Sequence, residues 1–264
     1  MNKKLLAAIF AASLCCMPLA ACGRNQKNTA QESPAIEAPA LPEDDTPAVS
    51  FPKRAEYVMV QSNGLNVRSG AGTGYSSLGQ VEKGVLLHFD GEENGWYKTQ
   101  YRGRTAYVSA SPAYTAIAYL DEGDEVIENV IREGLKVLGV PYVYGATRYH
   151  DGKGNLLKGF STDKFDCSSL MQYIFHRGAG VLLDVTTRTQ VLQGTKVTKS
   201  NLKRGDLMFF TNASRKNNTG IERIGHVALY LGDNYILHTA SDYAKIEQIS
   251  STRWSYFIEG RRVL

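Results

Sequence analysis

Two helical patterns precede a series of strand patterns in the second half of the chain, and this order limits the folds available to it. Apolar residues recur at helical spacing over 124–140, and a second helical pattern runs from 167 to about 180. Strand patterns follow at 205–210, 224–232, 234–240 and 253–263. Helices followed by an antiparallel sheet predict an α+β domain, which we place at residues 122–264.

The preceding segment, residues 55–118, has a different character. Short runs rich in Val, Tyr and Leu alternate with glycine-containing turns, as in "LNVRSG" and "GWYKTQY". A segment of this length with this pattern predicts a small all-β barrel.

The first 21 residues have the pattern of a secretory signal, with two lysines, an apolar run and then small residues. The end of this segment, "LAAC", resembles the lipobox of bacterial lipoproteins, which implies that Cys22 is lipidated and becomes the first residue of the mature chain. Cleavage near Ala21 without lipidation is the alternative. Residues 22–54 contain five prolines and no periodic apolar face, which predicts a flexible linker. We therefore expect a protein in the cell envelope, anchored by lipid to a bacterial membrane and facing outside the cytoplasm.

The cysteines are distributed unevenly. Cys15 and Cys16 lie in the signal, so lipidation of Cys22 leaves Cys167 as the one unmodified thiol of the mature chain. A single thiol in an exported protein either pairs between molecules or takes part in chemistry. Cys167 begins a helical pattern, and the unpaired N–H groups and positive dipole end of a helix N-terminus favour the thiolate. This indicates a nucleophile, which still needs a base beside it.

Two histidines can supply that base and a group that orients it. In "GHVALYLG", His226 alternates along a predicted strand, and His238 lies in the next one, "YILHTA". If the turn between them centres on Asp233, the two histidines are diagonal neighbours on one face, with backbones roughly 7–8 Å apart. A slip of one residue would place them on opposite faces.

Five motifs occur in order through this region: "PYVYG", "FDCSS", "RGDLMFF", "GHVALYLG" and "ILHTA". Together they resemble the NlpC/P60 cysteine peptidases, a family with a compact papain-like fold. The resemblance implies that Cys167 is the nucleophile, His226 the general base and His238 the residue that orients it. It also implies that the hydroxyl of Tyr142 helps to stabilise the oxyanion.

The same resemblance suggests residues that bind substrate. In related enzymes that also carry a bacterial SH3 domain, the acid before the cysteine and the serine after it hold a free substrate amine, which implies this role for Asp166 and Ser168. The alternative is that Asp166 only caps the helix. The segment 147–164 is longer than the usual loop of the family at this place, and we expect it to line or cover the cleft. We expect His150, within this segment, to be exposed to solvent.

The barrel segment also resembles a known family. "LNVRSG", "GWYK" and "AYV" are similar to motifs of bacterial SH3 (SH3b) domains, which often bind cell-wall peptide. Whether this one binds a ligand or only packs against its neighbour and shapes a cleft stays open.

The sequence argues against several other classes of protein. A formal net charge of +4 is too small to indicate nucleic-acid binding, and no stretch after the N-terminus is long and apolar enough to cross a membrane. Cys167, His226 and His238 could in principle ligate zinc, but a cysteine at a helix start favours a nucleophile, so we expect no metal or other cofactor.

We therefore predict a peptidoglycan endopeptidase that acts on stem peptides or muropeptides. The family preference is the bond between γ-D-glutamate and the following diamino acid, with release of L-Ala-γ-D-Glu in the dipeptidyl type. The alternatives are an amidase or acyltransferase on the same fold, or a non-catalytic lipoprotein that binds the cell wall.

Overall fold

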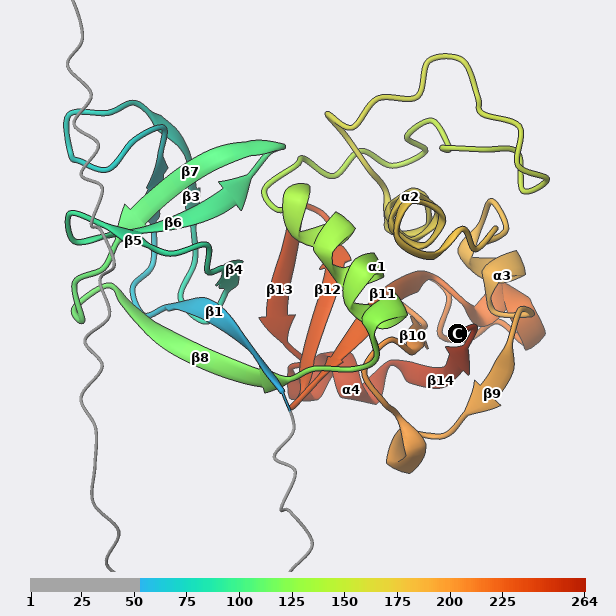
Figure 1. The fold of residues 1–264 in the computed structure, drawn as a ribbon. Helices are drawn as coiled ribbons and strands as arrows, with labels where there is room; N and C mark the ends of the chain where they lie inside the picture. The colour runs from blue at the N-terminus through green and yellow to red at the C-terminus, as the bar shows by residue number, and fades with distance from the viewer. Residues whose placement is uncertain (1–52) are drawn as a thin grey trace, which may run out of the picture. The chain divides into compact units, whose positions relative to one another are not determined.

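The computed structural model describes residues 53–264, and the predicted signal peptide, Cys22 and nearly all of the predicted linker lie outside this range. Its first part is all β and its second part mixes helices and strands (Figure 1), as the sequence predicts. None of the helices within the described range is both long and apolar enough to cross a membrane.

The all-β part contains eight strands, several of them separated by tight turns with positive-φ glycines. These strands are β1 (Arg54–Val60), β2 (Leu65–Arg68), β3 (Ser77–Val81), β4 (Leu86–His88), β5 (Glu92–Glu93), β6 (Trp96–Tyr101), β7 (Arg104–Ser109) and β8 (Thr115–Asp121). One sheet has the order β3-β2-β7-β6-β5, while β8, β1 and β4 belong to a second sheet. Alternating buried residues such as Ala106 and Val108 fill the space between them.

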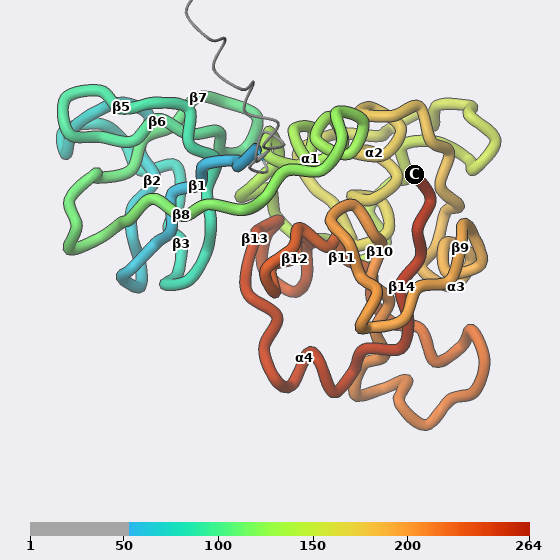
Figure 2. Tube along the Cα trace, turned by 60° about the horizontal axis from the view of Figure 1, so that its bottom comes forward, coloured from blue at the N-terminus to red at the C-terminus, as the bar shows by residue number. Residues whose placement is uncertain are grey.

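The second part carries the predicted helices and strands. Its helices are α1 (Glu125–Lys136), α2 (Cys167–Ala179), α3 (Thr187–Gln190) and α4 (Ser251–Ser255), with 3-10 turns at Lys199–Asn201 and Gly220–Arg223. Its strands are β9 (Thr195–Val197), β10 (Leu207–Phe210), β11 (His226–Gly232), β12 (Tyr235–Thr239), β13 (Ala244–Gln248) and β14 (Phe257–Arg262). Figure 2 traces α4 between β13 and β14, where the sequence had indicated only a strand.

The register of the central hairpin is the one predicted. Leu229 pairs with Leu237, and Tyr230 with Ile236, on either side of a turn in which Asp233 and Asn234 both have positive φ. Two consecutive residues in this conformation form the kind of turn that matches the twist of a hairpin. The next strand, β13, was not predicted, and it pairs with β12 along its whole length.

Helix α2 begins at Cys167 because Asp166 caps it. The Asp166 carboxylate accepts the backbone N–H of Ser169 at 2.9 Å, and the Ser169 hydroxyl accepts the backbone N–H of Asp166 in return. The helix ends at Gly180, whose φ of 68° is the left-handed conformation that favours glycine. Both ends of α2 are therefore fixed by local sequence.

Helix α2 is buried between α1 and the strands β11 and β12. Gly178 allows its close approach to α1, because a Cβ at this position would collide with the backbone of Val130. On the other side, Leu170, Ile174 and Phe175 are fully buried. This packing fixes the position of the N-terminus of α2 relative to β11.

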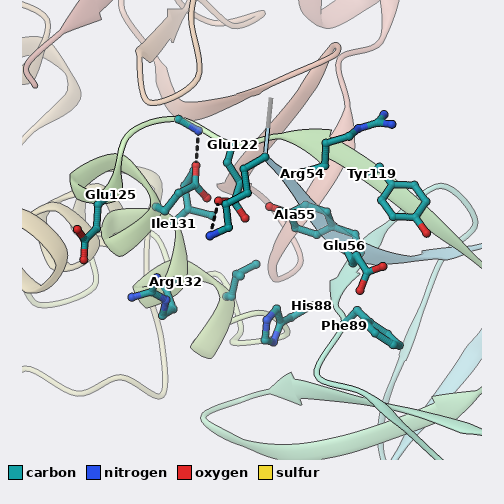
Figure 3. A pocket seen from close by; sticks show the side chains of 15 residues that line it. Arg54, Ala55, Glu56, His88, Phe89, Tyr119, Glu122, Glu125, Ile131 and Arg132 are labelled. Carbon is teal, nitrogen blue, oxygen red and sulfur yellow. Dashed lines mark hydrogen bonds and ion pairs between the residues drawn. The ribbon is translucent and has the colours of Figure 1, made fainter. Parts of the chain in front are cut away.

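The two parts share one sheet, in the order β8-β1-β4-β13-β12-β11-β10-β14-β9. Leu86 of β4 pairs with Ile246 of β13. The buried Arg204 adds a further link, because it pairs with Glu128 of α1 and donates to the Tyr57 hydroxyl of β1 at 3.0 Å. A pocket of about 900 Å³ lies between strands of the first part and α1 (Figure 3), and His88 and Arg132 are in its wall.

Candidate active site

Cys167 is the first residue of α2 and is 9% exposed. It is a free thiol, and it lines a pocket of about 360 Å³ together with His226 and Tyr142. The structure therefore brings together three residues that are far apart in the sequence. We call this space the histidine pocket.

The charge state of this thiol differs from the sequence prediction. The helix N-terminus was expected to favour the thiolate, but burial and the neighbouring Asp166 carboxylate raise the pKa of Cys167 to about 11. The backbone N–H groups of Val227 and Ser168 act in the opposite direction and do not offset the burial. The resting residue is thus a neutral thiol, which must lose its proton to a base before it can attack.

His226 and His238 are in direct contact, as predicted. His226 Nε2 lies 3.1 Å from His238 Nδ1, and the two rings are nearly perpendicular. His238 is fully buried behind His226. Burial, His238 and Arg253 hold the pKa of His226 well below 6.5, so His226 is neutral at neutral pH and can accept a proton.

Glu247 extends this chain of contacts, and sequence reasoning missed it. Its Oε1 lies 2.9 Å from His238 Nε2 and 3.1 Å from Arg253 Nη2. The His238 hydrogen bond and the nearby Lys245 and Arg253 outweigh desolvation and lower the pKa of Glu247 to about 2, so the carboxylate is ionised. Glu247 belongs to β13, whose alternation in "AKIEQ" could have identified the strand and placed Glu247 on the face of His238.

The ionised carboxylate fixes the protonation of both rings. An acceptor-only Glu247 requires a proton on His238 Nε2, which leaves Nδ1 of His238 as an acceptor. His226 then donates its Nε2 proton to His238, and its Nδ1 carries a lone pair. No hydrogen bond among residues 53–264 uses His226 Nδ1. The arrangement leaves a basic nitrogen free on the ring that shares a pocket with Cys167.

Tyr142 precedes the nucleophile in sequence and lies beside it in space. It forms a parallel bridge with Phe165, two residues before Cys167, and its backbone N–H donates to the backbone oxygen of Asp242. Desolvation and the nearby Cys167 and Asp166 raise the pKa of the Tyr142 phenol. Its phenol is therefore a neutral hydrogen-bond donor on a residue that lines the pocket.

A second pocket, of about 470 Å³, also reaches Cys167 and Tyr142. Its wall includes Arg148, Arg188 and Arg215, and we call it the arginine pocket. The residues that line the two pockets all lie between positions 142 and 256, so no described residue of the all-β part contributes to either. The barrel residues that the structure describes thus line neither pocket at Cys167.

Asp166 and Ser168, the predicted substrate-binding residues, both line the arginine pocket. The Ser168 hydroxyl donates to Asp166 Oδ1 at 3.2 Å, and this oxygen also caps the helix. Oδ2 accepts from Arg148 Nη1 at 2.7 Å and from the backbone N–H of Gly145 at 3.2 Å. Each carboxylate oxygen therefore already has two donors.

The segment 147–164 reaches the cleft through Arg148. The next two residues anchor it to α2: the ring of Tyr149 meets Tyr173 at 5.5 Å between centroids, and Gln172 Nε2 donates to the backbone oxygen of His150 at 3.2 Å. The expectation that His150 is exposed is wrong, because it is fully buried against His176 and Gln172.

The chemistry open to this site is nucleophilic. A buried thiol shares a pocket with a neutral imidazole whose orientation a second imidazole and a carboxylate fix. Within the range that the structure covers, no three His, Cys, Asp or Glu side chains gather as metal ligands would.

Comparison with known proteins identifies both parts of the chain. The model of the NlpC/P60 family matches residues 139–263, and that of the bacterial SH3 domain matches residues 63–126. Peptidoglycan endopeptidase RipA of Mycolicibacterium smegmatis is 32% identical over 139 residues, which are 52% of this chain and 26% of that protein. Gamma-D-glutamyl-L-lysine dipeptidyl-peptidase of Bacillus subtilis is 28% identical over 172 residues, 65% of this chain and 50% of that one. The chain thus spans half or less of the length of these two relatives.

Among solved structures, an NlpC/P60 family protein from Bacillus cereus is 22% identical with a TM-score of 0.43, and the match covers 80% of this chain and 64% of that one. The family models agree with the motifs, the α+β part and the preceding all-β part. Residues 139–263 of this chain therefore form an NlpC/P60 family domain, and residues 63–126 form a bacterial SH3 domain.

Proposed function

We propose that this protein is a cysteine endopeptidase that cleaves the peptide stems of peptidoglycan. The observation that carries the proposal is the pocket that Cys167 and His226 both line, together with the free Nδ1 of His226 that His238 and Glu247 set. The relatives' names, which describe a peptidoglycan endopeptidase and a gamma-D-glutamyl-L-lysine dipeptidyl-peptidase, support this choice of substrate.

In the proposed mechanism, His226 Nδ1 takes the proton of the Cys167 thiol as sulfur attacks the carbonyl carbon of the scissile amide. The backbone N–H of Cys167 and the Tyr142 hydroxyl donate to the oxyanion that develops. His226 then gives its proton to the leaving amine, and a thioester remains on Cys167. Water, deprotonated by His226, attacks the thioester and restores the thiol while releasing the new carboxylic acid.

In this mechanism His238 and Glu247 act through His226. The negative charge of Glu247 keeps a proton on the far nitrogen of His238, so that His226 presents its lone pair to the thiol. The same charge stabilises the positive His226 ring that forms during attack, across the intervening His238. We assign them as positioning residues.

For the substrate we propose the bond between γ-D-glutamate and the diamino acid that follows it. The histidine pocket would take the diamino acid and the arginine pocket the glutamyl side.

For location we propose the cell envelope, where the predicted lipid on Cys22 would anchor the protein to a membrane. For the SH3 domain, whose described residues line neither pocket at Cys167, we propose a role in binding cell-wall peptide.

The reaction products separate this proposal from the alternatives. We would incubate the full-length protein with muropeptides and identify the products by mass spectrometry. Cleavage between D-Glu and the diamino acid supports the endopeptidase. Release of the intact stem from muramic acid would indicate an amidase, and a new amide with an added amine would indicate an acyltransferase. Binding to peptidoglycan without any product would indicate the non-catalytic cell-wall protein.

A further inference from the structure

The arginine pocket carries more positive than negative charge close to the nucleophile. Arg148, Arg188 and Arg215 line it, and the one carboxylate in its wall is Asp166. Arg188 and Arg215 share a single exposed partner, Glu222, while Arg148 pairs with Asp166 itself. A ligand that enters this pocket meets a surface that attracts anions and repels cations.

The Asp166 carboxylate is already occupied by donors of this chain, among them Arg148. Asp166 is 4% exposed, and its two oxygens already accept four hydrogen bonds, two each. A carboxylate has about four lone-pair sites, so a substrate ammonium group would have to displace one of these donors. The guanidinium of Arg148 is the strongest of them, because its bond to Asp166 is charge-assisted.

The Arg148 guanidinium has more N–H groups than its hydrogen bonds within residues 53–264 use. Its Nε donates to the backbone oxygen of Val185, and its Nη1 to Ala146 and Asp166. None of the hydrogen bonds among residues 53–264 uses Nη2, although the side chain lies in the pocket wall. Because Tyr149 and His150 are packed on α2, this guanidinium is held in place. A fixed guanidinium edge with free N–H groups is suited to a carboxylate.

We propose that Arg148 is a specificity-determining residue that makes the pocket select an acyl chain with a carboxylate and a capped amine, and reject a free N-terminal amine. This inference rests on the proposed function. In a γ-linked D-glutamyl residue the α-carboxylate is free, and it is the group that Arg148 would bind. The capped amine is that of a stem still attached to muramic acid or to another acyl group. The enzyme would thus act on stems within the wall rather than on freed peptides.

The test compares three substrates on the full-length protein: L-Ala-γ-D-Glu-diaminopimelate with a free amine, the same peptide N-acetylated, and the N-acetylated peptide with the glutamyl α-carboxylate amidated. We expect kcat/KM to be about tenfold higher for the acetylated peptide than for either of the others, the discrimination that roughly 1.4 kcal/mol provides. Equal or faster cleavage of the free-amine peptide, or indifference to the amidation, would overturn the inference. Failure to cleave any of the three would instead overturn the proposed function on which it rests.

Two variants assign the selection to Arg148. Arg148→Met is expected to weaken both preferences, because Asp166 is then open to an amine and the carboxylate loses its partner, while Arg188 and Arg215 remain in the pocket wall. Arg148→Lys keeps the charge and is expected to keep the rejection of the free amine while losing part of the carboxylate preference. Lys158→Met, at an exposed cation of the same segment, is the matched control and should retain both ratios. The ratios are compared within each variant, so a loss of folded protein does not alter them. Unchanged ratios in Arg148→Met would contradict the assignment.

Discussion

Removal of the Glu247 side chain should impair His226 as the catalytic base, because Glu247 acts on His226 through His238. In the intact protein the carboxylate accepts the His238 Nε2 proton at 2.9 Å and holds His226 Nδ1 free. In Glu247→Ala that proton would be buried without a partner, since His238 is fully buried. Arg253 and Lys245, which contact Glu247, would supply donors in place of an acceptor. The tautomer of His238 that carries its proton on Nδ1 then becomes favourable, and this proton is directed at His226 Nε2.

The size of the effect follows from the lost hydrogen bond. A buried donor without a partner costs about 1–3 kcal/mol, so the productive tautomer falls by roughly 5- to 150-fold, and kcat should fall with it. Glu247→Gln should recover most of this loss. Arg253 Nη2 and His238 Nε2 both lie at Oε1, so their N–H groups favour an orientation in which the amide oxygen stays at that position and still accepts from His238; Lys245, which lies at Oε2, is the more distant cation at 3.5 Å.

The assay is kcat on the acetylated stem peptide, together with ¹⁵N chemical shifts of labelled histidines, which distinguish the two tautomers. Glu259→Ala is the matched control, because Glu259 is also a partly buried carboxylate between two cations but lies on β14. It should leave kcat and the histidine shifts unchanged. A Glu247→Ala protein that retains kcat within twofold, or a Glu247→Gln protein as impaired as the alanine variant, would refute the tautomer argument.

Three further predictions concern pH, the oxyanion and packing. Because the base must be unprotonated and burial lowers the pKa of His226 well below 6.5, kcat/KM should stay level down to pH 6.5 and decline only below it; a decline that begins above 6.5 would contradict the assignment. Tyr142→Phe should lower kcat by about 10²–10³-fold with little change in KM, as expected for an oxyanion donor, and unchanged kcat would exclude that role. Gly178→Ala should lower the free energy of unfolding in urea by about 1–3 kcal/mol, because the added Cβ meets the backbone of Val130. An unchanged free energy of unfolding would show that α1 and α2 can move apart without an energetic cost.

The hairpin that carries the two histidines could be predicted because local chemistry determines it. The Asp233-Asn234 turn closes the hairpin with Gly232 opposite Tyr235, and a register shift between Tyr230 and Gly232 then gives the predicted pairs, which place His226 and His238 on one face. The start of α2 at Cys167 is equally local, since Asp166 and Ser169 form its capping box. These features depend on residues close in the sequence.

The rest of the site depends on contacts across the chain. Glu247 joins it only because β13 pairs with β12, and the alternation along β13 does not by itself show which strand it pairs with. The neutral state of Cys167 reflects its burial, which outweighs the helix N-terminus. The pairing of Arg148 with Asp166 joins a long loop to a helix cap, and the sequence contains no local signal for it.

The measurement that tests the central claim most directly compares the full-length protein with its Cys167→Ala variant on the acetylated stem peptide, with products read by mass spectrometry. The thermal unfolding of both proteins is recorded in parallel. We predict that the unmodified protein cleaves after D-Glu, and that the variant unfolds at the same temperature and releases no product. Cleavage by the folded variant would show that Cys167 is not the nucleophile and would contradict the mechanism built on it.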